Sequence, residues 1–175
     1  MTALTILLVL ASRVMNENEK LIQTFYSAFQ KKDYATMQRL YHPQAHFSDP
    51  VFTSLNSSEV KAMWQMLILA GKDLRISFSN VKANDKNGSC HWEAWYTFSR
   101  TGKKVHNLID ASFEFKDSLI LTHRDVFDFW RWSRQSLGVA GLLLGWSPAI
   151  KNKVRNTAAS NLQKFMQQAI HNTQG

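Results

Sequence analysis

A chain of 175 residues is long enough for one domain and too short for two of ordinary size. Its residues are 45% hydrophobic and 19% charged, which excludes a wholly disordered protein, and its single cysteine, Cys90, excludes an intramolecular disulfide. The net charge of +8 is concentrated at one end, because residues 131–175 hold six Lys or Arg residues and no Asp or Glu.

Residues 1–15 form an N-terminal extension of uncertain status. Their apolar stretch has the length of a signal-peptide core, but no basic residue precedes it, and Arg13 stands where a small-residue cleavage site would be needed. We expect the fold to begin near Met15, with residues 1–14 a mistaken start or a loosely packed extension. A weak export signal is the alternative. No apolar run reaches the roughly 18 residues of a membrane span, and we expect a cytoplasmic protein.

Three helices are predicted in the first half of the chain. Helical spacing of apolar residues starts after Asn16 and ends near Lys31, and a shorter helix capped by Asp33 is expected to stop at Pro43. The stretch 45–51 should be extended. Asn56 with Glu59 three residues later is typical of a capping box, so a third helix follows there.

From Leu74 onward the pattern changes to period two, which indicates β-strands. Four strands are expected within residues 74–129, joined by short turns, as in an antiparallel meander. The helices must then cover the apolar face of this sheet, so residues 16–132 are predicted to form one α+β domain.

Residues 133–175 are predicted to form a basic helical tail that packs on this domain. Leu137–Trp146 is apolar with three glycines, and Ser147-Pro148 is typical of the start of a helix, which should run to about Gln168. We expect the apolar segment to close the open end of the domain or to meet a second subunit. Attachment to an anionic membrane surface is the lesser alternative. Because aromatic residues are not interleaved with its basic ones, the tail does not indicate nucleic-acid binding.

Polar residues on apolar strand faces are the main functional signal. Asn107 interrupts the apolar face of the third strand, and His123 with Asp125 interrupts that of the fourth. Burying a carboxylate is costly unless it is paired, so these positions indicate either a structural hydrogen-bond network or a pocket with an acid–base group. Asp49, in an apolar extended segment, is either a turn residue or a second such group.

Two further candidates complete this set. Tyr26 on the inner face of the first helix is either a core residue or a hydroxyl in the cavity. Asp110 falls on the more polar face of its strand and is therefore expected to face solvent. No glycine-rich phosphate loop is present. We expect no metal and no cofactor.

Several strings in the sequence resemble the SnoaL-like and ketosteroid-isomerase-like superfamily, which has the nuclear transport factor 2-like fold. The matching strings are Phe25–Phe29, Tyr41–Pro50 with its Asp-Pro pair, and Asp110 through the stretch His123–Phe129. The resemblance implies a cone-shaped roll, in which a curved antiparallel or mixed sheet and three N-terminal helices enclose a mostly apolar pocket. The C-terminal helices lie outside this common fold.

The resemblance also implies roles for individual residues. Asp49 matches the base of ketosteroid isomerases, Asp110 matches their protonated aspartic acid, and Asp125 matches the acid–base aspartate of SnoaL-like cyclases. Trp92 and Ala94 stand where limonene-epoxide-hydrolase-like members carry an Arg-x-Asp pair, so an epoxide hydrolase of that type is not expected.

Together these observations predict a pocket for an apolar small molecule. Asp125 or Asp49 would move a proton, and Asn107 or Tyr26 would stabilise an oxyanion, as in an isomerase, cyclase or hydrolase. A non-catalytic ligand-binding or dimerisation module, including a homodimer, is the alternative. The expected lining consists of Phe29, Phe47, Trp64, Trp92, Tyr96, Ile109 and Phe127, together with the polar candidates named above.

Overall fold

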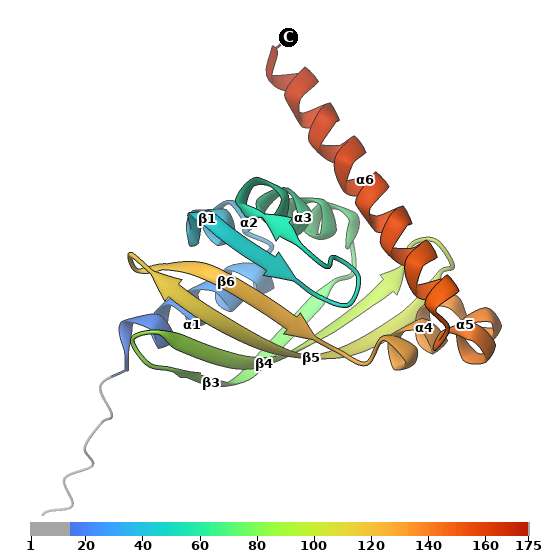
Figure 1. Cartoon of the computed structure of the whole chain (residues 1–175), viewed down its shortest axis with the longest axis horizontal. Helices are drawn as coiled ribbons and strands as arrows, with labels where there is room; N and C mark the ends of the chain where they lie inside the picture. The colour runs from blue at the N-terminus through green and yellow to red at the C-terminus, as the bar shows by residue number, and fades with distance from the viewer. Residues whose placement is uncertain (1–14, 175) are drawn as a thin grey trace, which may run out of the picture.

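A computed structural model describes residues 15–174, and they form an α+β domain with one six-stranded sheet (Figure 1). The proposals made for residues 1–14 lie outside the described residues. The elements in chain order are α1 (Glu17–Gln30), α2 (Tyr34–Arg39), β1 (Tyr41–Ser48), β2 (Leu55–Asn56), α3 (Ser57–Ala70), β3 (Arg75–Ala83), β4 (Asn87–Phe98), β5 (Lys103–Lys116), β6 (Leu119–Val126), α4 (Phe129–Leu137), α5 (Val139–Leu144) and α6 (Pro148–Gln174).

The sheet is mixed and has the order β2-β1-β6-β5-β4-β3. Strands β3 to β6 form the expected antiparallel meander. Beyond β6, strand β1 adds in parallel, with Phe47 opposite His123, and β2 adds antiparallel to β1. The parallel pairing of β1 with β6 depends on residues about 75 positions apart in sequence, and no local pattern indicates it.

Local signals at the helix starts are confirmed. The Asn16 side chain accepts a hydrogen bond from the Asn18 backbone, and Asn56 with Glu59 makes a complete capping box at the start of α3. The second helix was expected to stop at Pro43, but it ends at Arg39. Pro43 instead lies inside β1, where the pairing with β6 shifts between Tyr41 and His46, so its missing N–H breaks no regular ladder.

The first three helices pack on the concave face of the sheet and build the core there. Helix α1 contacts β3 and β4, and α3 contacts β1 and β2 (Figure 1). The core between them is unusually aromatic: Phe25 lies edge-on to the rings of Tyr26, Tyr41 and Trp64 at centroid distances of 5.2–5.7 Å. These contacts fix the wall from which the candidate site is built.

The C-terminal part differs from the expectation in two respects. Strand β6 ends at Val126 rather than near Phe129, because Asp128 caps α4 by accepting a hydrogen bond from the Arg131 backbone. The last helix continues to Gln174, contacts α3 and projects beyond the body of the domain (Figure 1). None of the described helices is both long enough and apolar enough to cross a membrane.

Most of the apolar segment before α6 does not close the open end of the domain, which was the first of the two roles expected for it; contact with a second subunit stays a prediction. Residues Val139, Leu142, Leu143, Leu144 and Trp146 are exposed within the described chain, and it is α6 that lies over the open side of the sheet. The glycines of this segment explain the arrangement. A Cβ atom on Gly141 would lie 1.8 Å from the Ser133 carbonyl oxygen, and one on Gly145 would lie 1.9 Å from the Ser133 hydroxyl. The glycine side of α5 therefore packs on α4, and its leucines point outward.

Candidate functional site

A cavity of about 510 Å³ lies between the concave face of the sheet and helices α3, α4 and α6. Its walls are mostly aromatic and aliphatic, and all seven apolar residues singled out in the sequence border it: Phe29, Phe47, Trp64, Trp92, Tyr96, Ile109 and Phe127. Helix α3 adds Met63, Met66 and Leu67, and α6 adds Val154, Thr157, Ala158 and Asn161. The size and lining suit a small apolar ligand, with few polar groups to orient it.

Asp125 is the most buried of the polar residues that line this cavity, with 3% of its surface exposed. The alternation of β6 places it on the inner face of the sheet, two residues after His123. Its Oδ1 atom accepts hydrogen bonds from His123 Nε2 at 3.0 Å and from Trp92 Nε1 at 3.3 Å. Its Oδ2 atom has no hydrogen-bond partner among the described residues, so that oxygen is available to a ligand.

His123 is fully buried behind Asp125 and does not border the cavity. Its Nδ1 atom lies 2.6 Å from the Tyr41 hydroxyl, which also accepts a hydrogen bond from Trp64 Nε1 at 2.9 Å. A carboxylate oxygen can only accept, so His123 Nε2 is the donor in its contact with Asp125. In the tautomer that carries its proton on Nε2, Nδ1 accepts a hydrogen bond from the Tyr41 hydroxyl. A continuous hydrogen-bonded chain therefore runs from α3 through β1 to the carboxylate.

Burial has a clear effect on Tyr41. It raises the pKa of Tyr41 well above the ordinary value, the nearby Asp125 charge raises it further, and the hydrogen bond from Trp64 acts in the opposite direction. Tyr41 therefore keeps its proton at all physiological pH values and acts as a fixed donor to His123. Aromatic contacts hold the imidazole in place, with the Phe113 ring at 4.4 Å and the Phe47 ring at 5.1 Å between centroids.

Asp49 lies just after β1 and also borders the cavity. Its Oδ1 atom accepts hydrogen bonds from the backbone N–H groups of Val51 and Phe52 at 2.6 and 2.5 Å. Asp49 is therefore both a turn residue and a residue of the cavity wall. Burial raises the pKa of Asp49 to about 7, with a further increase from the Asp125 charge. The backbone hydrogen bonds and Arg155 oppose the rise. Asp49 can therefore bind or release a proton near neutral pH.

Asn107 lies on β5, opposite Ala94 of β4, and its side chain borders the cavity. No partner for its amide is found within residues 15–169, so the amide is free to bind a ligand. Two candidates lie elsewhere. Tyr26 is fully buried outside the cavity wall, and its hydroxyl has no hydrogen-bond partner among the described residues. Asp110 lies on the outer face of the sheet, where it is exposed and 2.8 Å from His91 Nδ1.

Three features of the site were not found from the sequence. Tyr41 was assigned to a helix, Trp132 was not singled out, and the apolar segment 137–146, rather than α6, was expected to close the open end of the domain. In the structure Trp132 Nε1 donates to the Tyr96 hydroxyl at 2.8 Å, and Arg155 donates to the Pro50 carbonyl at 3.0 Å. The Asp-Pro turn and α6 are thereby joined. The second half of β1 falls in the stretch predicted to be extended, and Pro43, two residues after Tyr41, was the signal that the strand begins earlier.

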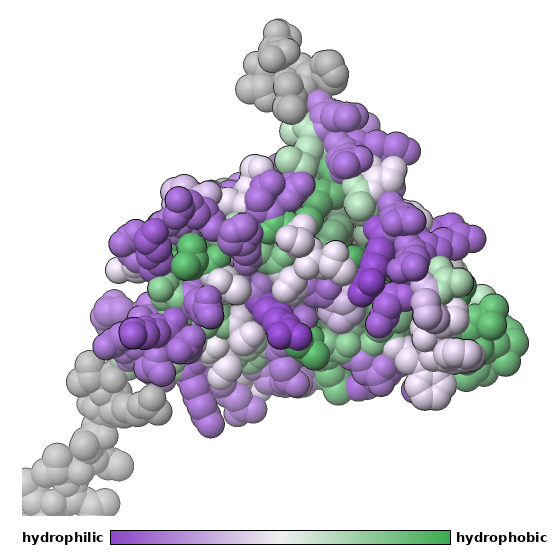
Figure 2. All heavy atoms as spheres, in the orientation of Figure 1, coloured by the Kyte–Doolittle hydropathy of each residue, from purple (hydrophilic) through white to green (hydrophobic). Residues whose placement is uncertain are grey.

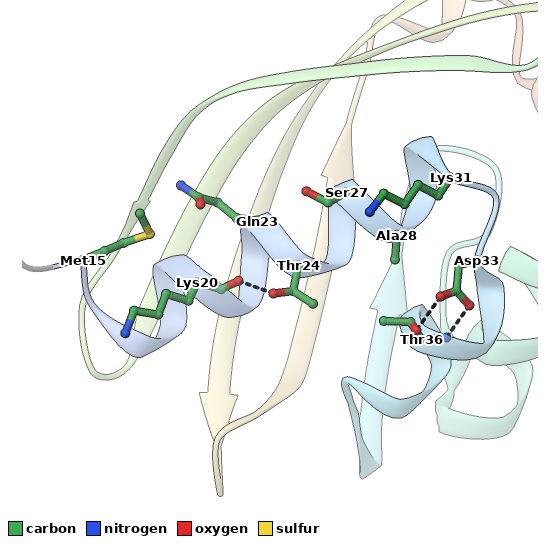
Figure 3. A pocket seen from close by; sticks show the side chains of 9 residues that line it. All are labelled: Met15, Lys20, Gln23, Thr24, Ser27, Ala28, Lys31, Asp33 and Thr36. Atoms are coloured by element: carbon green, nitrogen blue, oxygen red, sulfur yellow. Dashed lines mark hydrogen bonds between the residues drawn. The ribbon is translucent and has the colours of Figure 1, made fainter.

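A second hollow, of about 450 Å³, lies outside the body along α1 and the start of α2 (Figure 3). Its carboxylate, Asp33, caps α2 by accepting hydrogen bonds from the backbone N–H and the hydroxyl of Thr36 at 3.0 and 2.6 Å. The Thr24 hydroxyl there donates to the Lys20 carbonyl. Because these polar groups are engaged in hydrogen bonds within their own helices, we place the candidate site in the interior cavity. Within residues 15–174 no three His, Cys, Asp or Glu side chains are grouped as metal ligands would be.

Comparison with known proteins gives one family match. Residues 22–123 match the profile of the SnoaL-like domain. Among curated proteins, none is similar enough in sequence to count as a relative.

Solved structures share the fold at low sequence identity. IdmH, a putative polyketide cyclase from Streptomyces antibioticus, is 19% identical, with a TM-score of 0.59 over 71% of this chain and 100% of its own. An epoxide hydrolase from M. tuberculosis, described as LEH-like, is 15% identical, with a TM-score of 0.57 over 73% of this chain and 96% of its own. A hypothetical protein with a ketosteroid isomerase-like fold from Catenulispora acidiphila is 8% identical, with a TM-score of 0.61 over 74% of this chain and 98% of its own.

Proposed function

Because the chain belongs to the SnoaL-like domain family and has the nuclear transport factor 2-like fold, we propose that it is a cofactor-independent acid–base enzyme acting on an apolar small molecule. The ligand would be an oxygen-bearing, ring-containing compound held by the aromatic walls of the cavity. Asp125 would be the base, protonated Asp49 the acid, and the Asn107 amide a hydrogen-bond donor to the developing oxyanion.

The position of Asp125 is the observation that carries this proposal. Its carboxylate is buried in an apolar cavity, one oxygen is held by two N–H donors, and the other oxygen is left to the ligand. A carboxylate needed only for structure would be expected to use both oxygens, since each unpaired buried acceptor is costly. The arrangement instead orients a single reactive oxygen.

The proton transfer that these groups support can be written in full. Asp125 Oδ2 removes a proton from a carbon next to a ligand carbonyl, and the electron pair of the C–H bond moves to the carbonyl oxygen. That oxygen receives a proton from Asp49 or a hydrogen bond from Asn107. A pKa of about 7 suits Asp49 to give and take a proton at neutral pH. The product is an enol if Asp49 gives its proton and an enolate if Asn107 only donates a hydrogen bond. Protonated Asp125 can return its proton to another carbon, which is an isomerisation, or the enol or enolate can attack a second carbon, which is a cyclisation.

His123 and Tyr41 are positioning residues in this proposal, because they act through Asp125. The chain from Trp64 through Tyr41 to His123 fixes the imidazole tautomer, so that Nε2 always presents a donor to Asp125. Their replacement should alter the pH profile of the reaction as well as its rate.

Hydrogen–deuterium exchange tests the proposal before the natural substrate is known. A panel of cyclic enolisable ketones is first ranked by binding, and the best binders are incubated with the protein in D₂O. Mass spectrometry then follows deuterium uptake at the carbon next to the carbonyl. Asp125→Asn should lower the exchange rate by about 10²–10⁴-fold while leaving ligand binding largely intact. The matched control is Asp110→Asn, which removes an exposed carboxylate from the outer face of the sheet.

The same experiment decides against the alternative of a non-catalytic binding module. If bound ketones exchange no faster than they do in buffer, or if Asp125→Asn exchanges as fast as the unaltered protein, the acid–base proposal is wrong. A pocket that binds without exchange would then be a ligand-binding site alone.

A further inference from the structure

Exposed apolar side chains gather at one end of the molecule, on α5 and directly after it. We call Val139, Leu142, Leu143, Leu144 and Trp146 the apolar tip; each is more than half exposed, with Val139 at 72% and Trp146 at 69%. Figure 2 shows the tip as a continuous hydrophobic area at the right-hand end, over the place where Figure 1 draws α5. Scattered single leucines need no explanation, but five large apolar residues within eight positions indicate an interaction surface.

The tip is held in place by the packing of α5 on α4. Gly141 and Gly145 are both buried against Ser133, with no room for a Cβ atom, and the Ser133 hydroxyl lies 3.4 Å from the Gly141 carbonyl. At the junction, Gly138 has a φ of +64°, which permits the sharp change of direction between the two helices. Because the glycine side of α5 must face α4, its leucines cannot turn inward without unpacking the hairpin.

The shape of the tip distinguishes between partners. It projects from the end of the domain (Figure 1), and neither of the two hollows described above is lined by a residue of the tip. A projecting apolar surface fits the fluid interior of a lipid layer, because lipid chains can rearrange around it. The tip includes Trp146, and Trp130 on α4, the helix that packs on α5, is also 42% exposed; tryptophan favours the boundary between lipid and water.

Cationic side chains on the segments that adjoin the tip complement an anionic surface. The Arg134 guanidinium lies 4.4 Å from the centre of the Trp130 ring, the Lys103 side chain lies against Gly138, and the Lys151 ammonium lies 5.5 Å from the centre of the Phe129 ring. Residues 131–175 contain no Asp or Glu, and the nearest acidic residue before them in the chain is Asp128, the N-cap of α4. Apolar side chains in a segment with an excess of cations are typical of proteins that bind anionic bilayers at the surface.

We propose that the apolar tip inserts into the surface of an anionic lipid bilayer, with the surrounding Arg and Lys side chains on the lipid headgroups. This docking does not depend on the chemistry of Asp125. It would place α4 at the bilayer, and Trp132 and Leu137 of that helix also border the interior cavity. An apolar ligand dissolved in the membrane would then be close to the cavity wall.

Vesicle co-sedimentation with the full chain tests the proposal. The protein is mixed with vesicles of phosphatidylcholine alone or of phosphatidylcholine with phosphatidylglycerol, at low and at high salt. We expect sedimentation with the anionic vesicles that weakens as salt is added. Leu143→Glu should lower the partition coefficient at least about tenfold, because an inserted leucine is replaced by a charge that the lipid repels.

Two further variants make the test specific. Leu69→Glu is the matched control, since Leu69 on α3 is exposed to a similar extent, 57% against 62% for Leu143, but lies far from α5 in the chain; its partition coefficient should not change. The double variant Arg134→Gln, Lys151→Gln should reduce binding to anionic vesicles about tenfold. Melting temperatures confirm that the variants are folded.

Three results would overturn the proposal. The first is a protein that does not sediment with anionic vesicles at low salt. The second is equal loss of binding in Leu143→Glu and Leu69→Glu. The third is a dimer in sedimentation velocity that Leu143→Glu dissociates while the vesicles leave it intact, which would assign the tip to a second copy of the chain.

Discussion

The protonation state of Asp49 gives the sharpest quantitative prediction. Asn has the shape of Asp and can accept the same hydrogen bonds from Val51 and Phe52, but it carries no charge. In the unfolded chain Asp49 ionises near the ordinary aspartate pKa of 3.8, whereas in the folded protein burial and Asp125 raise the pKa to about 7. Between these values the folded state binds the proton more tightly, so the contribution of Asp49 to stability falls as pH rises.

The size of the effect follows from the shift. A rise from 3.8 to about 7 is about three pH units, and at about 1.4 kcal/mol per unit it corresponds to about 4 kcal/mol over the whole range. About two of these units lie between pH 5 and pH 8, where the protein can be compared most easily. Asp49 keeps part of its surface exposed, and solvent screening reduces the expected difference to about 1–3 kcal/mol.

Urea unfolding at constant ionic strength measures this quantity. We expect Asp49→Asn to gain about 1–3 kcal/mol in free energy of unfolding, relative to the unaltered protein, on going from pH 5 to pH 8. The control is Asp110→Asn, on the solvent side of the sheet. If the two variants show the same pH dependence relative to the unaltered protein, Asp49 is not a buried charge, and its role as an acid fails with it.

Three further predictions concern stability and ligand access. Tyr41→Phe should lower the free energy of unfolding in urea by about 1–3 kcal/mol, because Trp64 and His123 lose their shared hydrogen-bond partner. Tyr26→Phe should change it very little, because the Tyr26 hydroxyl has no partner among the described residues. Equal losses in the two variants would contradict these hydrogen bonds. Gly141→Ala should lower the melting temperature and cost about 1–3 kcal/mol by displacing α5 from Ser133, and an unchanged melting temperature would refute that packing. Ala158→Trp should fill the cavity from α6 and abolish ligand binding in calorimetry without unfolding the protein; unchanged binding would place the ligand elsewhere.

Most of the fold could be predicted from local patterns, because each depends on neighbours in the sequence. The Asn56 and Glu59 side chains satisfy backbone N–H groups within one turn, so a capping box identifies the start of α3. Alternation on β5 and β6 places Asn107 and Asp125 on the inner face, since side chains of a strand point alternately to its two sides. The same rule placed Asp110 outside. These residues were therefore found before any contact was known.

The tertiary structure decided what depends on long-range contacts. The Tyr41 hydroxyl reaches His123 only because β1 pairs in parallel with β6, and Asp49 acquires its raised pKa only where Asp125 and the apolar walls surround it. The composition of α5 likewise did not determine whether its leucines are covered. They are exposed because the glycine side of α5 packs against α4. The periodicity of a sequence indicates which residues lie on the same face of a helix or strand. Only the packing of segments distant in sequence determines what that face contacts.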